Sequence, residues 1–128
     1  MRIIILSLVL IGLLSACNTS RPLTNVEGHK IQGLLDEGET LEDVKINIIR
    51  AGKLLGWEME EVKTGMIQGT LRLRAHTAVV NIPYNLQSYS ILYVTSINLD
   101  YDGKKIHRSY ARWVNNLKVK IDEFIGAR

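Results

Sequence analysis

The first pattern along the chain is an uncharged, mostly apolar run that follows Met1 and Arg2 and covers the twelve residues 3–14. As a helix, a run of that length would rise only about 18 Å, which is well short of the roughly 30 Å of a bilayer core. A short basic start, a compact apolar stretch and then small residues are typical of a secretory signal peptide. We therefore expect residues 1–16 to be a signal peptide and not a membrane span.

The end of this run, Leu14-Ser15-Ala16-Cys17, resembles the lipobox of bacterial lipoproteins. The resemblance implies transfer of a diacylglyceryl group to the Cys17 sulfur, cleavage after Ala16, and acylation of the new amine by a fatty acid such as palmitate. In bacterial lipoproteins, retention in the inner membrane usually needs Asp directly after the lipidated cysteine. Asn18 stands at that position here, so the resemblance implies a lipid anchor in the outer membrane with the domain in the periplasm. The alternative is a secreted protein with a free thiol at Cys17, which secreted proteins tend to avoid.

Residues 17–39 are predicted to form the acylated cysteine and a tether or arm. Residues 18–25 are polar, contain Pro22 and show little periodicity, which favours a flexible tether. Residues 26–38 are ambiguous, because Ile31, Leu34 and Leu35 fit either one helical turn or an extended arm on the domain surface.

A helical repeat of apolar positions begins just after Thr40, which forms a capping-box pattern with Asp43. The apolar positions recur at steps of three and four, at Leu41, Val44, Ile48, Ala51 and Leu55. Gly56 is well suited to end such a helix.

From Trp57 onward, alternating apolar and polar positions predict four strands, over residues 57–63, 66–74, 77–84 and 89–99. In the last of these, we expect Tyr89, Ile91, Tyr93, Thr95, Ile97 and Leu99 to share one face. Thr64-Gly65 predicts the first turn. The Ala75-His76 connection lacks the usual Gly or Asn, so a hairpin turn and a bulge in one continuous strand both remain open.

Helical spacing returns after Asp102-Gly103, at Ile106, Tyr110, Trp113, Leu117, Ile121 and Phe124. The order is therefore α-β-β-β-β-α in a single domain over residues 40–128. The simplest arrangement is an α+β fold, in which an N-terminal and a C-terminal helix pack on one face of a four-stranded antiparallel sheet.

A further resemblance is carried by four stretches: Gly56-Trp57; Gly69 with Arg74-x-His76-x-Ala78-Val79-Val80-x-Ile82-x-Tyr84; Tyr89-Ser90-Ile91-x-Tyr93-x-x-Ser96-x-Asn98-Leu99; and Ile106-His107-x-x-Tyr110-x-x-Trp113-Val114-x-Asn116-Leu117. Together they resemble a group of small, largely uncharacterised proteobacterial lipoproteins. The resemblance implies an envelope location and a compact α+β domain. It implies no catalytic residue, ligand or partner.

The composition excludes several classes of protein but indicates no particular reaction. With 128 residues, 23% charged residues, two Pro and one Cys, the chain is not collagen-like, disulfide-stapled or wholly disordered. Removal of residues 1–16 leaves 112 residues with no cysteine beyond the predicted lipid attachment point at Cys17. The composition suggests no cofactor, and export argues against a nucleic-acid partner.

Charge is unevenly distributed, with a net −4 over residues 17–62 and +6 over residues 63–128. Basic side chains crowd the expected start of the last helix, where they oppose the helix dipole. Together with free backbone N–H groups, they make a candidate anion-binding site of Lys104, Lys105, His107, Arg108 and Arg112. The alternative is a solvated basic face.

All five tyrosines lie within residues 84–110, and four of them, Tyr84, Tyr89, Tyr93 and Tyr101, form a candidate binding surface. The alternative, which the residue type favours, is ordinary sheet packing, because tyrosine is common in strands. The histidines, His29, His76 and His107, have no metal-ligand spacing, so no metal site is predicted.

We therefore expect a non-enzymatic lipoprotein, held in the membrane by Cys17, that binds or scaffolds an anionic envelope component or an envelope protein. The alternatives are a small envelope hydrolase or modifying enzyme that uses His76 or His107, and a structural accessory subunit of a larger assembly.

Overall fold

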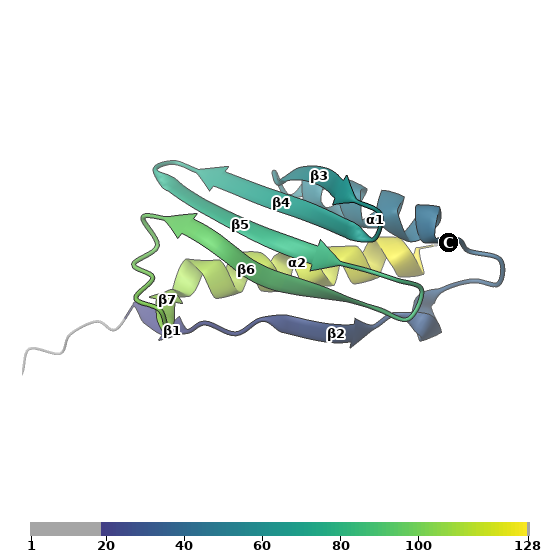
Figure 1. Cartoon of the computed structure of the whole chain (residues 1–128), viewed down its shortest axis with the longest axis horizontal. Helices are drawn as coiled ribbons and strands as arrows, with labels where there is room; N and C mark the ends of the chain where they lie inside the picture. The colour runs from purple at the N-terminus through teal and green to yellow at the C-terminus, as the bar shows by residue number, and fades with distance from the viewer. Residues whose placement is uncertain (1–18, 128) are drawn as a thin grey trace, which may run out of the picture.

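The computed structural model describes residues 19–127 as a layer of strands lying over two helices (Figure 1). The elements are β1 (Ser20–Pro22), β2 (Val26–Lys30), the 3₁₀ turn η1 (Gln32–Leu34), α1 (Leu41–Leu54), β3 (Glu58–Lys63), β4 (Met66–Leu73), β5 (His76–Pro83), β6 (Ser88–Ile97), β7 (Lys105–His107) and α2 (Arg108–Gly126). The α+β class is confirmed. Two helices and four strands lie in the predicted regions, and the ends of the strands differ from the prediction by no more than two residues.

The prediction of a four-stranded sheet is wrong in its strand count. The main sheet has five antiparallel strands in the order β2-β6-β5-β4-β3, and β1 and β7 form a separate two-stranded antiparallel sheet. The additional strands are three to five residues long and lack a clear alternation, so they carry no pattern that distinguishes them from loops. They form because neighbouring elements offer free backbone groups to pair with.

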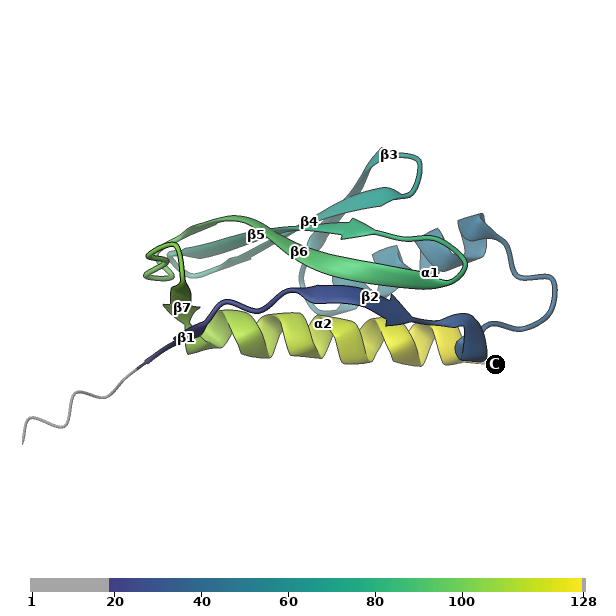
Figure 2. The same ribbon diagram turned by 60° about the horizontal axis from the view of Figure 1, so that its bottom comes forward.

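Both helices lie on the same side of the main sheet, which leaves its other face uncovered by any element of residues 19–127 (Figure 2). The core between the layers combines Val44 and Ile48 of α1 with Leu117 and Ile121 of α2, all fully buried. The sheet contributes buried side chains from alternate positions, including Ile67, Val80 and Ile91. The single core accounts for most of the apolar periodicity in the sequence.

Close packing of α1 on the sheet depends on two glycines. Gly52 in α1 and Gly69 in β4 both face the thioether of Met59, and a Cβ at Gly52 would collide with it. The capping box at the start of α1 is present, with the Thr40 hydroxyl accepting from the Asp43 N–H and the Asp43 carboxylate accepting from the Thr40 N–H. The Thr40 N–H and the Thr40 hydroxyl both donate to the Asp43 carboxylate and lower its pKa.

The β4–β5 connection is a two-residue hairpin turn at Arg74-Ala75, with Leu73 opposite His76. Arg74 has a φ of 57°, a left-handed conformation that is uncommon for a residue with a side chain. The structure thus resolves the alternative between a turn and a bulge in favour of a turn.

A bulge does occur in β6, at Val94. Val80 is paired with Tyr93 and Val79 with Thr95, so one residue of β6 is left over. Because the bulge reverses the alternation, Thr95 and Ile97 lie on the opposite face from Tyr93, and both are exposed. The prediction that they share a face with Tyr89 and Ile91 is therefore wrong.

The first described residues are attached to the domain. The Arg108 N–H donates to the Thr19 carbonyl (2.8 Å) and the Leu23 N–H donates to the Lys104 carbonyl (2.9 Å). Further along, Ile31 is fully buried in the core. The segment predicted as tether or arm thus contributes two strands, one 3₁₀ turn and a core side chain.

The predicted signal peptide, the lipobox and Cys17 lie outside the described residues. Within residues 19–127, neither helix has the combination of length and apolar character needed to cross a membrane.

Candidate binding site at the end of the sheet

The candidate site lies where β6 loses its partner on one side. β2 pairs with β6 as far as Val26 opposite Ile91. One step beyond, the side-chain carbonyl of Asn25 takes the place of a strand and accepts from the Tyr93 N–H at 2.9 Å. On the N-terminal side of Asn25, the chain lies away from β6 and leads back to β1, which pairs with β7 instead. The last part of β6 is therefore left beside a gap in the sheet edge.

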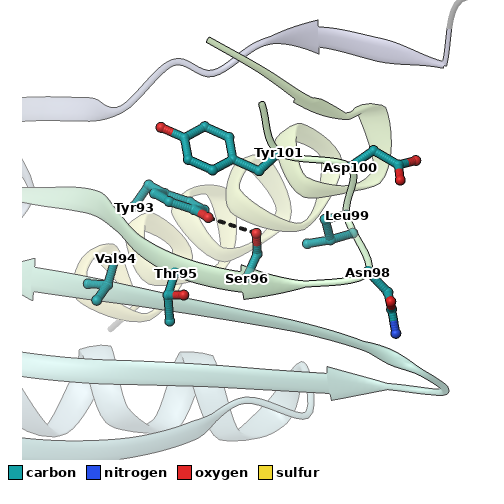
Figure 3. A pocket seen from close by; sticks show the side chains of 8 residues that line it. All are labelled: Tyr93, Val94, Thr95, Ser96, Asn98, Leu99, Asp100 and Tyr101. Carbon is teal, nitrogen blue, oxygen red and sulfur yellow. Dashed lines mark hydrogen bonds between the residues drawn. The ribbon is translucent and has the colours of Figure 1, made fainter. Parts of the chain in front are cut away.

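A cavity of about 500 Å³ lies at this edge. We call it the tyrosine pocket; it is lined by Tyr93, Val94, Thr95, Ser96, Asn98, Leu99, Asp100 and Tyr101 (Figure 3). The first four residues belong to β6 and the others to the loop that leads to β7. A strand end and the loop that follows it therefore build the whole pocket.

The rings of Tyr93 and Tyr101 form its aromatic side. The ring of Tyr93 lies 4.5 Å from that of Tyr101 and 5.6 Å from that of Tyr110, which comes from α2. The Tyr93 hydroxyl is 2.7 Å from the Ser96 hydroxyl, and Figure 3 shows the two side chains turned toward each other. Tyr101 is 42% exposed, so its ring is open to solvent on the outer side. Large aromatic surface and hydroxyl groups are thus available together.

Tyr110 differs from the other two, because its ring is buried. Its hydroxyl has no hydrogen-bond partner within the described residues. Burial, with a smaller contribution from Tyr93, raises the pKa of this phenol. An unsatisfied buried hydroxyl is uncommon and destabilising, and here it lies beneath the aromatic side of the pocket.

The loop side of the pocket has a strained backbone. Asn98 and Asp100 both have positive φ, 57° and 53°. The conformation is held by hydrogen bonds: the Asn98 side-chain amide donates to the Ala75 carbonyl at 2.7 Å, and the His107 N–H donates to the Leu99 carbonyl at 2.7 Å. Strain that the surroundings hold in place is frequent at binding sites. In Figure 3 the Asp100 carboxylate points away from the two tyrosine rings.

The pocket contains two of the four tyrosines predicted to form a binding surface. Tyr84 and Tyr89 are 7% and 1% exposed and pair with each other across the loop that joins β5 to β6. Burial raises the pKa of both phenols. They belong to the core, whereas Tyr93 and Tyr101 face the cavity.

The predicted anion-binding residues divide among three elements. Helix α2 begins at Arg108, so Lys104 lies in the preceding turn and Lys105 in β7. The Asp102 carboxylate accepts from the N–H groups of both lysines, which lowers its pKa. Two N–H groups at the start of α2 are also occupied. That of Arg108 donates to Thr19, and that of Ser109 donates to His107 Nδ1. Only Arg112 lines a cavity, a second one next to the tyrosine pocket.

One cluster of polar side chains could not be recognised from the sequence, because its members lie far apart along the chain. His29 Nε2 and the Tyr89 hydroxyl each lie 2.8 Å from a carboxylate oxygen of Asp122. His29 comes from β2, Tyr89 from β6 and Asp122 from α2. The cluster joins the N-terminal arm to the helix layer and opens onto neither cavity.

Neither His76 nor His107 is hydrogen-bonded to a carboxylate or a side-chain hydroxyl within the described residues. The same part of the chain holds no group of three His, Cys, Asp or Glu residues that could bind a metal ion. No family model, curated protein or solved structure significantly matches the chain.

Proposed function

We propose that the protein is an outer-membrane lipoprotein, anchored through Cys17, whose domain binds the glycan headgroup of an envelope glycolipid in the tyrosine pocket. The observation that carries the proposal is the cavity itself: about 500 Å³, with the exposed ring of Tyr101 beside that of Tyr93 and with the Ser96 hydroxyl hydrogen-bonded to the Tyr93 hydroxyl. The lipobox resemblance supports the anchor.

The chemistry of the pocket suits a sugar ring. Sugar rings present C–H groups on a face and hydroxyl groups at the rim. The tyrosine rings offer a flat apolar contact with a hydroxyl at the edge. The hydroxyls of Tyr93, Tyr101 and Ser96 offer donors and acceptors at the edge of the rings, whereas the side chains of Thr95 and Asp100 point away from them (Figure 3). Small-ligand sites commonly combine apolar surface with a few such polar groups.

The position of the pocket favours a ligand that belongs to the membrane. The first described residue, Thr19, is hydrogen-bonded to Arg108, and β1 and β7 lie at the same end of the molecule as the tip of β6 (Figure 1). An anchor at Cys17 brings this end toward the lipid surface. A membrane glycolipid is therefore a better candidate than a distant soluble sugar.

Binding is tested with the full chain purified from membranes in a non-ionic detergent and with immobilised lipopolysaccharide as the probe. Tyr101→Ala removes the exposed ring and is expected to weaken binding about tenfold, which corresponds to roughly 1.4 kcal/mol. Tyr101→Phe retains the ring and is expected to stay within about threefold. Leu54→Ala, a truncation at another exposed apolar position, on α1, is the control. Equal binding by Tyr101→Ala and the control would rule the pocket out.

The anchor is tested separately by Cys17→Ser in cells. We expect this variant to lose acylation and to leave the membrane fraction, whereas Ser20→Ala behaves as the parent. Unchanged processing and membrane association of Cys17→Ser would contradict the lipid anchor and leave the sugar-binding test unaffected.

A further inference from the structure

A second cavity, of about 300 Å³, lies on the other side of Asn98 from the tyrosine pocket. It is lined by Leu73, Arg74, His76, Ser109, Arg112 and Trp113. Arg74 comes from the β4–β5 turn, His76 from the start of β5, and the last three residues from α2. The walls of the two cavities are joined by a hydrogen bond of 2.7 Å between His76 Nδ1 and the Asn98 carbonyl.

The second cavity collects positive charge without a counter-charge. Its lining includes two guanidinium groups and an imidazole, and no carboxylate. Within residues 19–127, neither Arg74 nor Arg112 makes an ion pair, whereas Arg72, close by in β4, pairs with Glu58. Two unpaired arginines beside one cavity repel each other. An anion in the cavity would relieve that repulsion.

The polar groups around the cavity are arranged for an acceptor ligand. The Asn98 carbonyl can only accept, so His76 Nδ1 donates to it, and Nε2 can donate to an oxyanion only when the ring carries a second proton. Ser109 Oγ accepts from the Arg112 guanidinium at 3.3 Å, which orients both side chains. The indole of Trp113 supplies an apolar wall that is 9% exposed.

The backbone conformation of Arg74 also supports an anion-binding site. A tight turn with a φ of 57° favours Gly, Asn or Asp, and a long cationic residue there has a conformational cost. The cost has a simple explanation if the guanidinium contributes to a site.

We infer that Arg74, Arg112, His76 and Ser109 form a binding site for a phosphate monoester. Arginine binds phosphate with paired N–H groups, the Ser109 hydroxyl can donate to a third oxygen, and His76 Nε2 can donate as well when the ring is an imidazolium. This site stands on its own residues and does not depend on sugar binding in the tyrosine pocket.

The test uses the full chain in a non-ionic detergent and follows tryptophan fluorescence, to which Trp113 beside the cavity and Trp57 in the core both contribute, during titration with methyl phosphate, which carries no sugar. We expect saturable binding to the parent below about 10 mM. Two variants each remove one guanidinium: Arg74→Asn, whose new residue tolerates the left-handed turn, and Arg112→Gln. Each is expected to weaken binding at least about tenfold.

The matched control is Arg50→Gln, which removes the same charge from the exposed face of α1 and is expected to bind as the parent does. Unfolding midpoints of all variants show whether a loss of binding reflects a loss of fold. Absence of saturable binding to the parent, or equal affinities of the Arg74, Arg112 and Arg50 variants, would overturn the site.

The source of the phosphate is identified in the same assay by adding phosphatidic acid to the micelles. Displacement of methyl phosphate by the lipid indicates a membrane headgroup, whereas binding of methyl phosphate without displacement indicates a soluble ligand. Either result supports the phosphate site, and loss of the lipopolysaccharide interaction in Tyr101→Ala alone has no bearing on it.

Discussion

At the residue scale, Asp122 shows how one side chain can connect elements that are distant in the sequence. Its carboxylate accepts from the buried Tyr89 hydroxyl and contacts His29, with Lys118 at 3.8 Å. Removal of one partner from a buried hydrogen bond costs more than the bond contributes, because the other partner stays desolvated. The cluster is therefore expected to stabilise the arm against the helix layer.

We predict that Asp122→Ala lowers the free energy of unfolding by about 1–3 kcal/mol, measured by urea denaturation at neutral pH. The remaining acceptor for the Tyr89 hydroxyl is the Lys118 carbonyl at 3.2 Å. Glu123→Ala, at the next and exposed position, loses a surface ion pair with Lys120 and is expected to change stability by less than about 1 kcal/mol. Equal effects of the two substitutions would show that the cluster adds no more to the free energy of unfolding than a surface ion pair does.

The buried phenols predict an alkaline limit to stability. Burial raises the pKa of Tyr89 and of Tyr110, and for Tyr89 the hydrogen bond to Asp122 adds to the effect. In the unfolded chain these phenols ionise at about pH 10, whereas in the folded chain they stay neutral. The folded state then binds more protons, so the free energy of unfolding falls as the pH rises above about 10.

Tyrosinate absorbance during an alkaline titration measures this. We expect ionisation of fewer than five tyrosines while the chain is folded and a further increase in absorbance on unfolding. Tyr89→Phe should leave the folded-state amplitude unchanged and reduce the unfolding step. Ionisation of all five phenols before unfolding would contradict the prediction.

At the scale of elements, Met59 controls how closely α1 approaches the sheet. Its thioether fills the space that Gly52 and Gly69 leave free. On helix propensity alone, Gly52→Ala would stabilise α1 by up to about 1 kcal/mol. The collision of the new Cβ with Met59 works in the opposite direction, because tightly packed interiors accept extra methyl groups poorly.

We therefore predict that Gly52→Ala lowers the thermal unfolding midpoint, and that the cost decreases when it is combined with Met59→Ala. Such non-additivity is typical of residues in contact. Gly33→Ala is the control, since a Cβ at that position meets nothing within 4 Å. A stabilising Gly52→Ala would show that α1 can shift away from β3 without cost.

How much of the fold was predictable also depends on the element. α1, α2 and the four longer strands are marked by periodicity, caps and turns, and all were predicted. β1 and β7 were not, because each is three residues long and finds its partner more than eighty positions away. The bulge at Val94 was hidden, since apolar Ile97 continues the alternation although it is exposed.

The candidate sites follow the same division. The tyrosines drew attention by their number, but pattern alone did not separate buried Tyr84 and Tyr89 from Tyr93 and Tyr101. Arg112 was predicted as an anion ligand, whereas Arg74 was not, because only the β4–β5 hairpin brings it beside α2. Spacing along the chain carries no information about such contacts.

At the scale of the whole molecule, residues 19–35 form part of the folded domain and not a free tether. Hydrogen exchange measures this directly. We expect the paired amides of Val26–Lys30 to exchange at least about tenfold more slowly than those of Glu37 and Gly38 in the loop before α1. A tether would exchange as fast as that loop, and the same result here would contradict the pairing of β2 with β6.

The hydrogen bond between Thr19 and the start of α2 has a consequence for the proposed lipid anchor. From Cys17 to Thr19 the chain takes two steps of at most about 3.8 Å each. If Cys17 is acylated as proposed, so short a connection would hold this end of the domain at the lipid surface. Both cavities lie at that end (Figure 1), so the proposed ligands would be groups in the headgroup layer itself. A flexible insert after Cys17 would then let the domain reach ligands farther from its own membrane.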